Sequence, residues 1–203
     1  FAAFVILLGQ FGCKSIAPNT LSESVDSDSR RHVPPSNVDG GASDMLDDAR
    51  LHELRLRVDP AELKEQEASI ATDAKNLQQG KPASKTIWQA AMNYDGDDIG
   101  LIGYRHKGSF GTLGNCFDAK TGAQLCKKFS YSLIMDFVDP GLRLGGLKSL
   151  NLHSQSQDPT LMHEILAYKT FRAAGIPASR SAYVKVYIND EYKGCLLYTS
   201  PSP

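Results

Sequence analysis

Residues 147–194 constrain the fold most, because signals for a strand, a helix, a second strand and a turn follow one another there. Asp158 and then Pro159 predict the start of the helix, since aspartate caps free N–H groups and proline suits the first helical position. Gly175 and Pro177 predict its end. The large apolar side chains in between spread over a broad arc at about 100° per residue, so most of this helix is expected to be buried. They are Leu161, Met162, Ile165, Leu166, Tyr168 and Phe171.

Glu164 falls inside this apolar arc. A carboxylate that points toward a core is unfavourable unless a cation or several hydrogen-bond donors meet it. Lys127, Lys128 and Lys148 lie near the strands expected before the helix, and any of them could be its partner. In kinase-like folds a strand lysine pairs with a helix glutamate and holds the nucleotide phosphates. A structural ion pair that anchors the helix to the sheet explains the same pattern.

Strand signals recur along the rest of the chain. Apolar and charged residues alternate over residues 51–58, which is typical of a half-buried strand. Residues 61–80 read as a polar surface helix that ends at a glycine. A hairpin is expected within residues 85–108, a central strand at 129–136 and a further strand at 181–188. This order predicts an α+β fold in which an antiparallel sheet packs against a helix.

Arg105 and Lys107 lie on one face of the expected hairpin's second strand, just before Gly108 and Ser109. Such a place suits a phosphate, because the cations supply charge and glycine lets backbone N–H groups approach. Exposed cations on an edge strand are the alternative. His106 points the other way and is expected to be a surface or packing residue.

Cys116 and Cys126 flank a short loop. In an exported protein this spacing favours a disulfide over a metal site, since no second cysteine pair or histidine pair completes a zinc spacing. A cysteine nucleophile is a third reading, but the sequence nominates no histidine or acid as its partner.

The chain has 203 residues, 41% of them hydrophobic, and a formal net charge of -1. It can therefore hold one ordinary domain with tails, and it offers no basic patch for nucleic acid. Residues 1–13 begin with an apolar run too short to span a bilayer and typical of a secretory signal, so we expect export. Cys13 is either a lipid-anchor site or an ordinary signal-peptide cysteine. Residues 14–48 have few large apolar residues and predict a mobile tether.

Several motifs in order resemble the CotH kinases, the spore-coat protein H family. They are the "LNL" strand, the "DP" helix start, the "AGIPA" exit and the "VYIND" strand with its "YKG" turn, preceded upstream by "YRHKGSFG" and "KKFSYSLIMDF". The resemblance covers roughly residues 51–194, which we take as the N-terminal part of a kinase-like domain. Residues 195–203 resemble translated adapter sequence, so we expect a non-native tail that makes no specific contacts.

The resemblance implies an exported phosphotransferase that moves the γ-phosphoryl group of ATP to protein hydroxyls with Mg or Mn. It implies a fold like a truncated N-lobe of an atypical protein kinase. The phosphates would face Arg105, Lys107, Gly108 and Ser109, and one of Lys127, Lys128 or Lys148 would pair with Glu164. The catalytic base and the metal-binding acids would lie beyond residue 194, so these residues alone would be inactive. The alternative is a non-catalytic cell-surface or coat interaction protein of the same fold.

Overall fold

The computed structural model describes residues 42–84, 86–109 and 111–200. The expected signal segment, Cys13 and most of the expected tether therefore lie outside the described residues. Within the described part of the chain, no helix combines the length and the apolar character that crossing a membrane requires.

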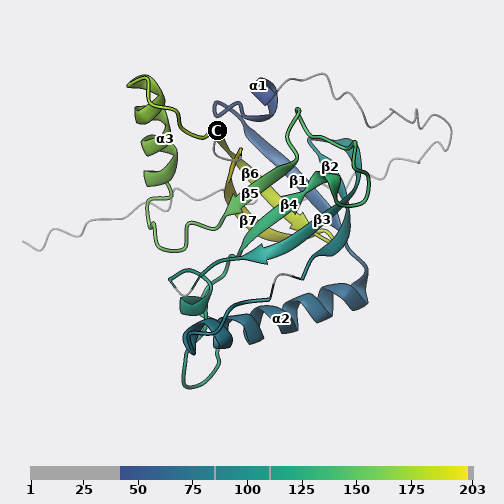
Figure 1. The fold of residues 1–203 in the computed structure, drawn as a ribbon, viewed down its shortest axis with the longest axis vertical. Coiled ribbons are helices and arrows are strands. Elements are labelled where there is room, and N and C mark those ends of the chain that lie inside the picture. Colours follow the sequence, from purple (N-terminus) through teal and green to yellow (C-terminus); the bar gives the residue numbers. More distant parts are fainter. Residues whose placement is uncertain (1–41, 85, 110, 201–203) are drawn as a thin grey trace, which may run out of the picture. The chain divides into compact units, whose positions relative to one another are not determined.

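Seven strands form one sheet that is antiparallel except for a single parallel pair, and this confirms the predicted α+β class. The sheet order is β1-β2-β3-β4-β5-β7-β6, and pairing of β1 with β6 closes it into a barrel (Figure 1), which the sequence did not predict. The strands are β1 Leu51–Arg57, β2 Trp88–Tyr94, β3 Asp97–Lys107, β4 Ser130–Ile134, β5 Ser149–His153, β6 Ser181–Ile188 and β7 Glu191–Thr199.

The barrel interior holds the hydrophobic core. Alternate residues of the strands point inward, because successive side chains of a strand face opposite sides. Leu54, Tyr104, Leu133, Leu152 and Val184 are all completely buried, each on a different strand. The outward positions at the ends of β3 and β5 carry polar side chains, among them Lys107 and His153.

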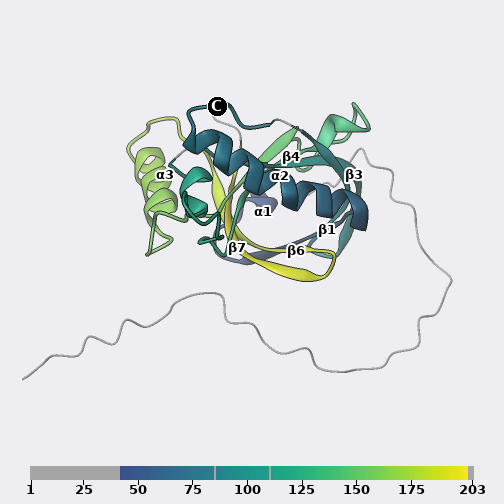
Figure 2. The ribbon, with the colours of Figure 1, turned by 90° about the horizontal axis from the view of Figure 1, so that it is seen from below.

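Two longer helices accompany the barrel, α2 Pro60–Gln78 and α3 His163–Ala173, with the short α1 Ala42–Met45 before β1. Two 3₁₀ turns cover Gly114–Cys116 and Met135–Phe137. The side chain of Asp59 caps α2 by accepting from Ala61 N at 2.8 Å, and α2 then crosses one end of the barrel (Figure 2). Four of its residues are buried, so α2 is less of a surface helix than its polar sequence suggests: Gln66, Ile70, Asp73 and Ala74.

The folded part begins earlier than expected. Met45 and Leu46 are buried in the core, and Tyr94 Oη donates to the Met45 carbonyl at 3.0 Å. Asp48 forms an ion pair with Lys169 of α3 at 2.9 Å. The boundary of the expected tether at residue 48 is therefore too late.

The helix expected after Asp158 starts later and is less buried than predicted. Leu161 has a positive φ of 58°, which interrupts a right-handed helix, so α3 begins only at His163. The Asp158 carboxylate still caps it by accepting from His163 N at 2.8 Å. Ile165 is the buried residue of α3, whereas Leu166 and Phe171 are about half exposed at 50% and 47%. The predicted burial of most of this helix is wrong, because only part of its apolar face packs against the barrel.

The expectation that residues 195–203 make no specific contacts is also wrong for residues 195–200. Cys195 to Thr199 form the second half of β7, which pairs with β6 and, at its end, with β5. Leu196 and Tyr198 point into the core and are buried. Leu197 between them is buried as well, so this segment is a short continuous apolar run, which is typical of a strand that is buried on both faces.

Cys116 and Cys126 form a disulfide, the pairing that the sequence favoured. The bridge closes a surface loop whose ends also share backbone hydrogen bonds, such as Leu125 N to Cys116 O at 2.7 Å.

We expect the double substitution Cys116→Ser/Cys126→Ser to lower the free energy of unfolding by about 2–3 kcal/mol, since the open loop gains entropy in the unfolded state. Denaturant unfolding of both proteins measures this difference. Thiol labelling of the non-reduced protein should miss both cysteines, and labelling of both would contradict the bridge.

Candidate functional site

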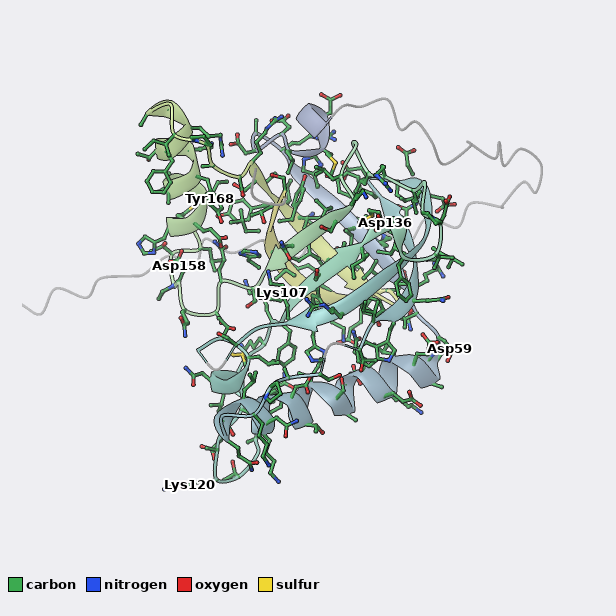
Figure 3. All side chains as sticks on the ribbon, in the orientation of Figure 1. Asp59, Lys107, Lys120, Asp136, Asp158 and Tyr168 are labelled. Carbon is green, nitrogen blue, oxygen red and sulfur yellow. A yellow bond between two sulfur atoms is a disulfide. The ribbon has the colours of Figure 1, made fainter. Side chains whose placement is uncertain are left out.

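One pocket gathers several of the residues that the sequence nominated. It has a volume of about 370 Å³ and lies where the ends of β3 and β5 meet the start of α3. Figure 3 shows Lys107 at the end of β3, Asp158 before α3, and Tyr168 on the side of α3 that faces the barrel. Lys107, Gly108 and Glu164 all line this pocket.

His153 links Lys107 to Glu164. Its Nδ1 lies 2.6 Å from Glu164 Oε1, and its Nε2 lies 3.3 Å from Lys107 Nζ. Tyr168 Oη donates to the same Glu164 oxygen at 3.1 Å from one helical turn further along α3. A lysine from β3, a histidine from β5 and a glutamate from α3 therefore form one hydrogen-bonded chain.

The chemistry of these partners assigns the hydrogen atoms. A lysine ammonium only donates, so His153 Nε2 must accept from Lys107. The other ring nitrogen then carries the hydrogen and donates to the Glu164 carboxylate. The neutral histidine satisfies both charged neighbours at once.

Burial acts to raise the pKa of Glu164, but the interactions of its carboxylate with His153, Tyr168 and Lys107 outweigh this effect and hold the pKa below its ordinary value. Burial lowers the pKa of Lys107, and repulsion from Arg105 adds to this effect while Glu164 opposes it. Glu164 therefore stays ionised, and Lys107 is a partly desolvated cation whose charge an anionic ligand would stabilise.

The loop after β5 supplies further polar groups to the pocket wall. Gln155 lines the pocket, and its buried Nε2 has no hydrogen-bond partner among the described residues. Ser154 is tied to β4, because its N–H donates to Ser130 Oγ at 2.9 Å. A spare amide donor thus lies in the same pocket as the Lys107 ammonium, which is a donor set suited to an anion such as phosphate.

Gly108 follows Lys107 at a position that only glycine fits. Its φ is +150°, and a Cβ atom there would lie 2.7 Å from Leu113 Cβ and 2.9 Å from Thr112 Oγ1. Ser109 N donates to Thr112 Oγ1 at 2.8 Å. Gly108 lines the pocket, whereas the backbone N–H of Ser109 is already used within the turn.

Other nominated residues lie elsewhere. Lys148 pairs with Asp136 at 3.7 Å, and Lys128 donates to the Cys195 carbonyl at 3.1 Å, so the structure gives neither as the ion-pair partner of Glu164. Lys148 lies just before the start of β5, whereas the chain leads to α3 from the end of β5. Lys148 is therefore at the end of this strand that is far from Glu164. Arg105 lies on the outer face of β3 opposite Ser132 of β4 and affects the pocket through its charge.

His153 and Tyr168, like Gln155, are site residues that sequence reasoning did not nominate. His153 shares the outward face of β5 with Asn151, so the strand period alone places it on the side of Lys107. Tyr168 lies four residues after Glu164 and hence on the same side of the helix. The signal for both was present, but their distance to Lys107 depends on tertiary structure.

Among the described residues, no group of three or more His, Cys, Asp or Glu side chains is placed to hold a metal ion. Residues 105–200 match the family model described as CotH kinase protein. A search of curated proteins finds no match to the chain.

Proposed function

Since residues 105–200 belong to the CotH kinase protein family, we propose that the intact protein is an exported phosphotransferase that uses ATP to phosphorylate protein hydroxyls. The barrel and α3 would form the N-terminal half of a kinase-like domain, with α3 as the helix that carries the paired glutamate. The single observation that carries the proposal is the chain from Lys107 through His153 to Glu164, beside the turn at Gly108.

Each residue has a task that follows from its contacts. Lys107 would attract the phosphates, because a desolvated ammonium gains most from a neighbouring anion. His153 Nε2 accepts from the ammonium, Glu164 fixes the orientation of the imidazole, and Tyr168 holds the Glu164 carboxylate. Gln155 Nε2 would donate to a phosphate oxygen from the loop after β5.

The family implies ATP as the cofactor, and the donors of this pocket suit the phosphate groups of ATP. ATP would supply the transferable γ-phosphoryl group, and a divalent metal ion would neutralise its charge. We assign the catalytic base and the metal-binding acids to sequence beyond residue 194. The residues described would position phosphate, with Arg105 adding positive charge near Lys107.

A second candidate function is a surface interaction protein that has kept the fold without catalysis. α3 and the segments on either side of it expose large apolar side chains, which is unusual unless a partner covers them. These are Met162, Leu166, Phe171 and Ile176, with exposed fractions of 44%, 50%, 47% and 51%.

We expect Lys107→Met in the full-length protein to weaken ATP binding at least about tenfold, because a charge-assisted hydrogen bond to phosphate is lost. Isothermal titration with ATP and Mg²⁺ measures the affinity. Lys64→Met is the matched control, since Lys64 is exposed on α2, away from the pocket. Equal ATP affinities for the two variants would remove Lys107 from the nucleotide site and favour the interaction protein.

A further inference from the structure

A second cavity lies between α2 and the end of the barrel that this helix crosses. Its volume is about 430 Å³, and none of its lining residues belongs to the Lys107 pocket. One stripe of α2 forms its first wall through Leu63, Gln66 and Ile70, which recur at helical spacing. The start of β4 and the turn between β6 and β7 form the others.

Gln66 is a buried polar residue of this wall with an unused donor. Its side chain is only 1% exposed, and its Oε1 accepts from Tyr104 Oη at 2.9 Å. Its Nε2 is buried and has no partner among the described residues. A buried amide donor that lacks an acceptor is unfavourable, so a ligand that supplies an acceptor here gains a full hydrogen bond.

Aromatic side chains form the opposite wall. Phe129 stacks on Phe117 with ring centroids 6.0 Å apart, and Tyr131 lines the cavity beside them. Tyr192 lines the side near the β6–β7 turn and is 40% exposed. Flat walls of this kind favour a flat apolar group, since aromatic pairs add attraction beyond the area that they bury.

The charges at the mouth are largely balanced. Lys193 pairs with Glu191 at 2.8 Å and lies 3.8 Å from Glu67, so these groups compensate one another. Lys127 also lines the cavity, but its side chain is exposed and remains hydrated. The site therefore places no strong demand for an anion or a cation on its ligand.

We propose that this cavity binds an uncharged aromatic amide, whose ring packs against Phe129 and Tyr192 and whose carbonyl oxygen accepts from Gln66 Nε2. The assignment stands apart from phosphoryl transfer, because the two pockets share no residue. An aromatic residue within a peptide carries both groups, and so does a small aromatic amide.

The test is a titration of the ¹⁵N-labelled chain with N-acetyl-tyrosinamide, followed through the side-chain NH₂ signals of Gln66. We expect saturable shifts of these signals, and no saturable shift with N-acetyl-alaninamide, which has the amide but not the ring. Absence of saturation with the tyrosine compound, or equal binding of the alanine compound, would overturn the proposal.

Two variants isolate the donor, and the second of them avoids leaving the buried Tyr104 hydroxyl without an acceptor. Tyr104→Phe removes only the hydroxyl that Gln66 accepts from, so the free Nε2 remains and the aromatic amide should still bind. Adding Gln66→Met to this variant removes the donor but keeps a similar side-chain shape. We expect the double variant, once circular dichroism shows that it is folded, to bind at least about tenfold more weakly. Equal affinities for the two variants would overturn the role of Gln66.

Discussion

Asp73→Ala is expected to lower the free energy of unfolding by roughly 3 kcal/mol and the melting temperature by about 10 °C. Asp73 Oδ2 lies 2.7 Å from His106 Nε2, and its Oδ1 accepts from Ser84 N at 2.7 Å. The side chains of Asp73 and His106 are 2% and 3% exposed. Removal of the carboxylate leaves the buried His106 Nε2–H and the partly buried Ser84 N–H without their acceptor, and the unpaired buried donor costs more than the lost contact itself.

Chemical and thermal unfolding of the purified chain measure this effect. Glu65→Ala is the matched control, because Glu65 lies on the same helix with an exposed side chain, and its change should stay within about 0.5 kcal/mol. A loss of less than 1 kcal/mol for Asp73→Ala, on the order of one ordinary hydrogen bond, would show that the α2–barrel contact does not depend on this pair.

Glu164→Gln should reduce phosphoryl transfer by the full-length protein by about 100-fold while its melting temperature changes little. Glutamine keeps the shape of the side chain and one oxygen for His153 Nδ1 or Tyr168 Oη, so the fold is retained. The negative charge that holds His153 toward Lys107 is lost, and the ammonium is then free to leave the phosphate position.

Initial rates at saturating ATP, normalised to folded protein, separate this role from a structural one. A purely structural glutamate would show the reverse pattern, with lower stability and unchanged turnover per folded molecule. Glu65→Gln is the control for charge removal at an exposed site. Wild-type turnover of Glu164→Gln would exclude this glutamate from the mechanism.

Local signals predicted much of the fold. The β2–β3 hairpin turns at Asp95 and Gly96, whose positive φ values of 51° and 98° are those that the Asp-Gly pair favours. Asp59 and Pro60 start α2 as expected. The motifs that resemble the CotH kinases lie mostly within residues 105–200, which are the residues that match the family model. Such features depend on neighbours in the sequence, so the sequence alone can specify them.

The errors have a common physical origin in tertiary structure. Periodicity shows which side of α3 is apolar, but not that Leu166 remains half exposed. It also shows that Glu164 needs a donor, but not that His153, at the far end of β5 from Lys148, is the side chain within reach. Barrel closure likewise depends on β1 meeting β6, and no local pattern encodes that pairing.

The parallel pairing of β1 with β6 also bears on how the chain folds. Val58 N donates to Asn189 Oδ1 at 2.8 Å across 131 positions of sequence, so this seam joins two segments with a long loop between them. The entropy of closing such a loop must be overcome before its contacts contribute, which makes barrel closure a slow and late step. Until β6 arrives, β1 has an unpaired edge along which another chain can add a strand, so folding intermediates are the species most exposed to aggregation.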